Sequence, residues 1–204
     1  MTNILYVTSS PRGKASHSTE VAAHVLEELK QAHPSAKVTV RDLARDPLPH
    51  IDEHFVAAIR NPNGPQNEAQ RKILARSDAL VDELLAADIV VLGVAMINFS
   101  IPSTLKAWLD YVARAGRTFR YSDKGPEGLV KGKQVIVVQA KGGVYSGDYK
   151  GADFLDPYLR HMLGFLGMTD VQAIAVEGTI SAADAALARG HECARAVVGE
   201  MARA

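Results

Sequence analysis

Residues 3–18 read Asn-Ile-Leu-Tyr-Val-Thr-Ser-Ser-Pro-Arg-Gly-Lys-Ala-Ser-His-Ser. The short apolar run from Ile4 to Val7 predicts a strand, which ends in a loop rich in hydroxyl groups. Residues 19–30 then carry valines and leucines at helical spacing. A strand, a polar loop and a helix in this order place the backbone N–H groups of the helix start where an anion can bind. The stretch therefore predicts an anion-binding turn at the first strand of an α/β fold.

The composition of this first loop, residues 9–18, narrows the choice of anion. Gly13 is its single glycine, which excludes the G-x-G-x-x-G dinucleotide turn, and the Walker A spacing is absent as well. Ser16 and Ser18 are natural N-cap residues whose hydroxyl groups can also reach phosphate oxygens. Either serine alone would by default only cap the helix. Together they favour a phosphate monoester and point to FMN.

The overall composition excludes several classes of protein. The 204 residues suffice for one well-buried domain, 1–204, and the 23 basic and 23 acidic residues balance. We therefore expect no nucleic-acid partner and no membrane partner. The single cysteine, Cys193, suits a reducing cytoplasm. His50 and His54 stand in the order H-I-D-E-H rather than H-E-x-x-H, so no metal site is predicted.

Apolar strand patterns alternate with helical patterns along the chain, which is typical of a parallel sheet with helices on both faces. The predicted strands are 3–8, 37–42, 88–95, 134–140 and 170–176, and the predicted helices are 17–32, 67–87, 102–116, 152–166 and 181–202. Five such strands favour the doubly wound, flavodoxin-like order 2-1-3-4-5 in a three-layer α/β/α arrangement. Segments 43–66 and 117–133, rich in proline and glycine, interrupt the alternation.

In this fold three loops converge at the carboxyl ends of neighbouring strands. They are the first loop, a second loop at residues 95–102 and a third loop at residues 140–145. Asn98 can match the pyrimidine edge of a flavin, while Met96 and Phe99 can pack beside the ring. Gly142 and Gly143 let backbone N–H groups approach closely, and Lys141 is a candidate source of positive charge. Taken singly, Asn98 and the two glycines are more often plain turn residues than ligand contacts, and Phe99 is by default a core residue.

The chain resembles the family of FMN-dependent NADH-azoreductases and quinone reductases, which has a flavodoxin-like fold. The similarity runs from about residue 4 to about residue 178. Four segments carry it: Ser9-Ser10 with Ser16-His17-Ser18; Met96-Ile97-Asn98-Phe99 with Ile101-Pro102 and Leu105-Lys106; the run from Ala113 to Tyr121 with 125–130 and Gly132-Lys133; and Lys141-Gly142-Gly143 with Pro157-Tyr158-Leu159 and 163–167. The third of these is the most specific.

The resemblance implies a homodimer that binds FMN non-covalently near the subunit interface and takes electrons from NADH. It assigns Ser10, Ser16, His17 and Ser18 to the phosphate, Met96, Ile97, Asn98 and Phe99 to the ring, and Ala140, Lys141, Gly142 and Gly143 to the pyrimidine edge. It places Phe119, Tyr121 and Tyr145 at the substrate pocket, and it allows the first two to act across the dimer. The family usually has Pro and Tyr where Ala95 and Ile97 stand, and Ser, Arg and His where Ala140, Lys141 and Tyr145 stand.

We therefore expect an NAD(P)H oxidoreductase in which the flavin carries the chemistry and no side chain is a catalytic nucleophile. NADH and then a quinone or azo compound would use one cleft in turn, which predicts ping-pong, two-electron kinetics. The alternative is an FMN-binding electron carrier without an acceptor site of its own. Segments 43–66 and 117–133 count against a carrier, because we expect them to add walls to a cleft.

Overall fold

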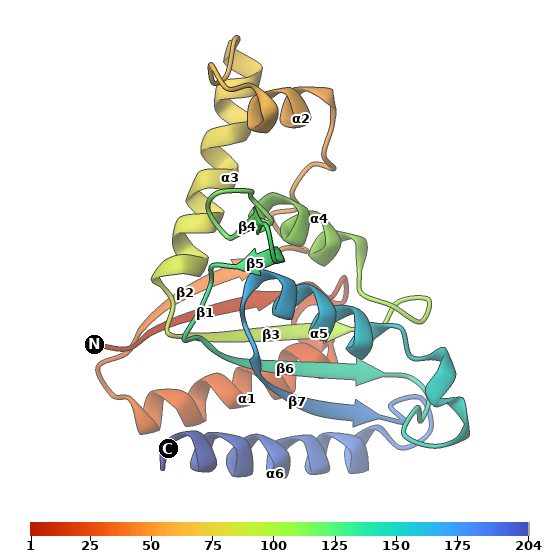
Figure 1. Ribbon diagram of the computed structural model, residues 1–204. Helices are drawn as coiled ribbons and strands as arrows, with labels where there is room; N and C mark the ends of the chain where they lie inside the picture. Colours follow the sequence, from red (N-terminus) through yellow and green to blue (C-terminus); the bar gives the residue numbers. More distant parts are fainter. Residues whose placement is uncertain (204) are drawn as a thin grey trace.

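The computed structural model describes residues 1–203, in which five parallel strands form a central sheet (Figure 1). The strands are β1 (Asn3–Thr8), β2 (Lys37–Asp42), β3 (Ile89–Ala95), β6 (Gln134–Lys141) and β7 (Asp170–Glu177). Their spatial order is β2-β1-β3-β6-β7, which is 2-1-3-4-5 among the strands of this sheet. The order predicted from the sequence is therefore confirmed.

Helices cover both faces of the sheet and complete three layers (Figure 1). One face carries α1 (His17–Ala32) and α6 (Ala183–Met201), and the other carries α3 (Glu68–Ala86), α4 (Ser103–Val112) and α5 (Leu155–Leu166). The short helix α2 (Glu53–Arg60) packs against the outer end of α3, beyond the sheet. None of the helices in the described residues is long and apolar enough to cross a membrane.

Alternate residues of each strand point to the two helical layers. Leu5 and Val7 join the core under α3, α4 and α5, while Ile4 and Tyr6 join the core under α1 and α6. The central strand β3 is buried on both faces from Ile89 to Val94, which explains its nearly continuous apolar sequence.

The first interrupting segment, 43–66, contributes to the core through α2. Leu43 and Leu48 are buried, and the Phe55 ring lies 4.8 Å from the ring of Tyr111 on α4. Asp52 caps α2 by accepting a hydrogen bond from the Phe55 N–H at 2.8 Å. The segment thus builds a second layer over α3 and α4.

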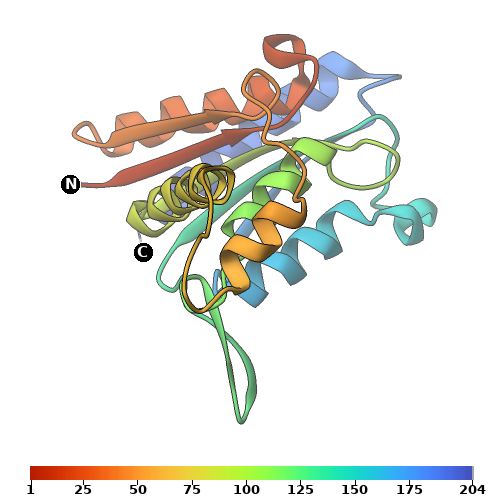
Figure 2. The ribbon, with the colours of Figure 1, turned by 90° about the horizontal axis from the view of Figure 1, so that it is seen from above.

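The second interrupting segment forms an antiparallel hairpin of β4 (Phe119–Ser122) and β5 (Gly125–Gly128). Figure 2 shows this hairpin projecting from the body of the molecule. It follows α4, which runs away from the carboxyl edge of the sheet, and leads into the amino end of β6. The hairpin is therefore attached at the edge of the sheet opposite the three loops.

Helix α4 ends at Val112, four residues before the predicted end at 116, because Thr118 replaces its next hydrogen bonds. The Thr118 hydroxyl donates to the Val112 carbonyl at 2.6 Å and accepts from the Arg114 N–H at 2.8 Å. Gly116 completes the bend with a φ of +80°, a conformation that glycine adopts without a steric penalty.

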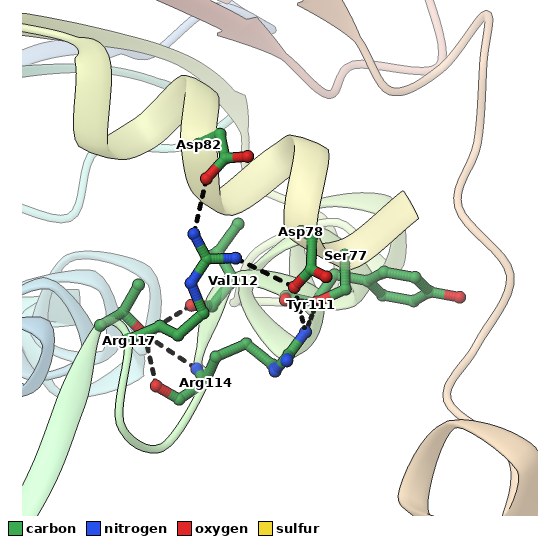
Figure 3. Close-up of polar contacts among 8 residues, drawn as sticks. Ser77, Asp78, Asp82, Tyr111, Val112, Arg114 and Arg117 are labelled. Carbon is green, nitrogen blue, oxygen red and sulfur yellow. Dashed lines mark hydrogen bonds and ion pairs between the residues drawn. The ribbon is translucent and has the colours of Figure 1, made fainter. Parts of the chain in front are cut away.

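Two arginines of this bend tie the base of the hairpin to α3 (Figure 3). Arg114 donates to Asp78 at 3.2 Å, and Arg117 donates to Asp78 at 3.0 Å and to Asp82 at 2.6 Å. Burial lowers the pKa of Arg114, while Asp78 opposes that effect. The specific run from Ala113 to Tyr121 is thus, in large part, the anchor of the hairpin.

Candidate functional site

The carboxyl ends of β1, β3 and β6 bring the three predicted loops to one edge of the sheet (Figure 1). The Ser9 N–H donates to the Gly93 carbonyl at 3.2 Å, joining the first loop to β3. The Met96 N–H donates to the Ala140 carbonyl at 2.8 Å, joining the second loop to the third. These bonds continue the ladders of the sheet, so the loops are placed by the strands themselves.

In the first loop, the serines do not cap the helix with their side chains. Ser16 is the N-cap of α1, yet its hydroxyl makes no capping bond and lies 3.0 Å from the Ser18 hydroxyl. Ser10, Ser16 and Ser18 are buried, and His17 is partly exposed. In the described chain the N–H groups of residues 17–19 donate to no backbone carbonyl. Hydroxyls and free N–H groups at a helix start are the donor set that suits a phosphate.

A glycine of β3 lets α1 approach this loop. A Cβ at Gly93 would lie 3.3 Å from the Cβ of Ala22 and 3.4 Å from the Ser18 carbonyl oxygen. The carbonyl of Gly93 also accepts a bond from the Ser9 hydroxyl at 3.2 Å. The start of α1 is thereby held close to the end of β3.

The second loop forms a tight turn at Asn98 and Phe99. Ile97 and Ser100 exchange backbone hydrogen bonds of 2.9 and 3.1 Å across it. The φ angles of Asn98 and Phe99 are +47° and +71°, which matches a type I′ turn and is unfavourable for a bulky residue. Phe99 is 52% exposed and so is not a core residue, contrary to its default interpretation. Strained, exposed aromatic residues of this kind are concentrated at binding sites.

In the third loop, within residues 1–203, the backbone carbonyls of residues 141–143 are hydrogen-bonded to the protein, whereas the N–H groups of the two glycines are not. The carbonyls of Lys141, Gly142 and Gly143 accept bonds of 2.9–3.2 Å from residues 178–180, which follow β7. Within residues 1–203, the N–H groups of Gly142 and Gly143 donate to no protein acceptor in the hydrogen-bond network. Ala140 is buried in the core under α1 and α6. The loop thus presents two free donors beside the second loop.

The Lys141 side chain lies in a buried cluster of charged groups. Its side chain is 4% exposed, and its ammonium group lies 2.5 Å from Asp153 and 3.4 Å from Glu177. A buried ammonium requires a counter-charge, and here two carboxylates supply more than one. The side chain therefore belongs to an ion cluster that joins the third loop to Asp153 and Glu177.

Two pockets flank the turn of the second loop. One, of about 270 Å³, is lined by Ser9, Pro11, Ala44, Ile97, Pro102, Ser103 and Thr104. The other, of about 520 Å³, is lined by Ile97, Asn98, Ser100, Ile101, Ser103, Lys106 and Tyr158. Ala44 belongs to segment 43–66, so that segment does add a wall. Segment 117–133 contributes no residue to either pocket.

The three candidate substrate residues are not brought together within one chain. Tyr145 lies in the third loop, with its ring 6.0 Å from the Lys141 ammonium. Phe119 and Tyr121 are on the hairpin, where their rings meet edge to face at 5.6 Å and Tyr121 is 75% exposed. Only Tyr145 therefore shares an edge of the sheet with the three loops.

Sequence reasoning missed two contributors to the site. Thr104 of α4 donates from its hydroxyl to the Ser9 carbonyl at 3.2 Å and so links the helix to the first loop. Phe154 donates its N–H to the Phe99 carbonyl at 3.0 Å and is itself 60% exposed. The sequence predicts Phe154 to lie inside the helix 152–166, and no pattern there marks a contact with a loop 55 residues earlier.

Comparisons with known proteins agree with this geometry. A family model described as "Flavodoxin-like fold" matches residues 2–198. An FMN-dependent NADH:quinone oxidoreductase of Mesorhizobium japonicum is 50% identical over 91% of this chain and 89% of its own length. A protein of the same name from Rhizobium johnstonii is 47% identical over 100% of both chains.

Solved structures extend the comparison. An azoreductase of Bacillus anthracis superposes with a TM-score of 0.90 at 30% identity, covering 98% of this chain and 100% of the other. A B. anthracis FMN-dependent NADH-azoreductase in complex with FMN gives 0.92 at 27% identity, covering 99% of this chain and all of the other. The chain belongs to the family of flavodoxin-like FMN-dependent NADH:quinone oxidoreductases and azoreductases.

Proposed function

We propose that this protein is an FMN-dependent NAD(P)H oxidoreductase that reduces quinones and azo compounds by two electrons in a ping-pong cycle, with NADH as the donor. The observation that carries the proposal is the meeting of a phosphate-type donor set, a strained exposed turn and free glycine N–H groups at one edge of the sheet. The names of the relatives support the choice of FMN, NADH and quinone.

The donors of the site fit FMN. The free N–H groups at the start of α1 and the hydroxyls beside them suit its phosphate, so Ser10, Ser16, His17 and Ser18 would hold that end. Met96, Ile97, Asn98 and Phe99 would line the ring. The backbone of Ala140, Lys141, Gly142 and Gly143 would face the pyrimidine edge, where N–H donors favour the reduced, more negative form.

Bound FMN supplies hydride acceptance and donation, and the protein supplies position and polarity. The turn at Asn98 and Phe99 presents apolar surface to the site and limits the access of water. The glycine N–H groups stay in place without reorganisation, because residues 178–180 bind the carbonyls of the same segment. With one cleft for both substrates, the oxidised nicotinamide has to leave before the acceptor enters.

The surroundings of the three loops favour a flat, apolar acceptor. Exposed apolar side chains gather there, among them Phe99, Phe154, Val144 and Ile180. Such a rim suits an aromatic compound, and equally a second copy of the chain. We propose a homodimer of one flavodoxin-like domain each, in which Phe119 and Tyr121 of the hairpin reach the site of the other subunit. The lone cysteine, Cys193, fits a reducing cytoplasm as the compartment.

The test is an anaerobic absorption spectrum of the purified protein before and after NADH is added. We expect flavin bands that NADH bleaches and that a quinone restores. Initial rates at varied NADH and quinone should then give parallel lines in double-reciprocal plots. Flavin bands that NADH leaves unchanged would favour the electron carrier, and the lack of any FMN binding would refute the proposal.

A further inference from the structure

The turn at Asn98 and Phe99 needs support from outside itself, because both residues adopt left-handed conformations. We propose that the buried ion cluster of Lys141, Asp153 and Glu177 is a positioning device that holds this turn and the third loop in register for the flavin ring. The contribution to the turn stands on the contacts alone. The contribution to flavin binding rests on the function proposed above.

Lys141 is the centre of the cluster. It ends β6, and its ammonium group is bonded to Asp153 at 2.5 Å and to Glu177, at the end of β7, at 3.4 Å. The three side chains are exposed by only 4%, 11% and 12%. Since the ammonium is out of water, withdrawal of either carboxylate would remove one of its charge-assisted hydrogen bonds without water to replace it. The cluster therefore fixes three separate segments of the chain at one point.

Asp153 transmits this fixation to the turn of the second loop. Its second oxygen accepts the N–H groups of Leu155 and Asp156 at 3.0 and 3.3 Å, which sets the start of α5. Phe154 lies between Asp153 and Leu155, which are joined by this bond, and its N–H donates to the Phe99 carbonyl at 3.0 Å. A continuous series of hydrogen bonds and peptide links therefore connects the Lys141 ammonium, through Asp153 and Phe154, to Phe99.

Glu177 makes the corresponding contact to Ser146, the residue that follows the third loop. Its Oε1 faces Lys141, and its Oε2 accepts the Ser146 N–H at 3.2 Å. Burial alone would raise the pKa of Asp153, but the bonds from Lys141 and from the N–H groups of α5 outweigh it and lower that pKa. The Asp153 carboxylate that faces Lys141 is therefore charged at neutral pH.

The experiment compares Asp153→Asn with Asp156→Asn. The first keeps an oxygen for the N–H groups of α5 but removes the charge that faces Lys141. The second is a matched control in the same helical turn, because Asp156 also binds a β6 side chain, Gln139, at 2.6 Å. Hydrogen exchange is measured on FMN-free protein, and FMN affinity is measured by quenching of flavin fluorescence.

We expect exchange at Ile97, Ser100 and Phe154 to accelerate about tenfold in Asp153→Asn, with exchange in β3 unchanged. FMN affinity should fall about tenfold, since a displaced binding turn loses contact geometry. Asp156→Asn should stay within about twofold of the natural protein in both measurements. Lys141→Met should reproduce the Asp153→Asn exchange pattern, and Lys141→Arg should largely restore it.

Unchanged exchange at the three amides in a folded Asp153→Asn protein would overturn the proposal, as would equal effects of the two asparagine variants. Accelerated exchange with unchanged FMN affinity would overturn the link from the cluster to the flavin. If the natural protein binds no FMN, the proposed function fails, while the exchange comparison still decides whether the cluster holds the turn.

Discussion

At the scale of single residues, the hydrogen-bond partners of a serine distinguish one that caps a helix from one whose hydroxyl is available to a ligand. A capping serine directs its hydroxyl to a backbone N–H of the first turn. Ser16 and Ser18 instead bind each other, and the N–H groups beside them stay free. Buried polar groups that satisfy only one another retain hydrogen-bonding capacity for a ligand.

We predict that Ser18→Ala weakens FMN binding roughly ten- to a hundredfold, because a hydrogen bond to a charged group contributes about 1.5–3 kcal/mol. Titration of the FMN-free protein with FMN measures this change. Ser77→Ala on α3 is the control, because it removes an equally buried hydroxyl that donates to the Tyr111 carbonyl away from the three loops. Unchanged affinity in Ser18→Ala would mean that the serine only shapes the helix start.

A second residue-scale prediction concerns Gly128 of β5, which crosses the end of α5. A Cβ there would lie 2.1 Å from the backbone nitrogen of Gly167, whose own φ of +102° excludes most other residues. Gly128→Ala should lower the free energy of unfolding by about 1–3 kcal/mol, as expected for overpacking against backbone. Gly164→Ala, where a Cβ meets nothing within 4 Å, should be neutral or slightly stabilising in the same urea titration. Equal stability of the two variants would contradict the close crossing.

At the scale of elements, the site depends on side chains that join strands and helices rather than on any one loop. The hairpin is attached to α3 by Arg114 and Arg117, and α5 is attached to β6 by Asp153. Each attachment includes an ion pair with a largely buried cation, Arg114 with Asp78 in the first and Lys141 with Asp153 in the second. Removal of one partner of a buried ion pair lowers the free energy of unfolding by more than the intact pair contributes, because the remaining charge is left buried and unpaired.

The element-scale prediction follows from the lowered pKa of Asp153, which lies below the ordinary value of 3.8 in the folded protein. A carboxyl group with a lowered folded pKa stabilises the fold above its unfolded pKa, and this stabilisation is lost as pH falls through the folded pKa. Asp153→Asn should therefore cost about 1.5–3 kcal/mol at neutral pH. The difference from the natural protein should shrink as the pH falls below about 4. Urea unfolding at several pH values measures it, and a difference independent of pH would be inconsistent with a charged Asp153.

At the scale of the whole molecule, one chain leaves the site open. The pockets beside the turn are lined by the loops, by α4 and by Ala44, while the hairpin with Phe119 and Tyr121 is attached at the opposite edge of the sheet. Tyr121 is 75% exposed and so is available for the contact across the dimer proposed above. A second copy would both bury it and close the site.

We predict a particle of twice the 21.9 kDa chain mass in sedimentation velocity. Tyr121→Ser should lower kcat/KM for a quinone roughly tenfold while FMN affinity is unchanged. Mixed dimers of Ser18→Ala and Tyr121→Ser subunits should then regain one intact site if the hairpin acts across the dimer. A mixture with no more activity than its parents would place the hairpin in its own subunit's site or in none.

The sequence by itself determined the sheet and the layers. The apolar patterns of the strands and helices are local, and a right-handed crossover leaves few ways to connect them. The order 2-1-3-4-5 followed and is confirmed. The placement of three loops at one edge followed as well, because the carboxyl ends of parallel strands share that edge.

Only the tertiary structure decided what the loops do with their side chains. The ammonium of Lys141 turned from the site to Asp153 and Glu177, which come from segments 12 and 36 residues away in the sequence. The left-handed turn at Phe99 is held by Phe154, and the hairpin lies at the far edge because α4 carries the chain there. Such contacts join residues distant in sequence, and local hydrophobic periodicity contains no information about them.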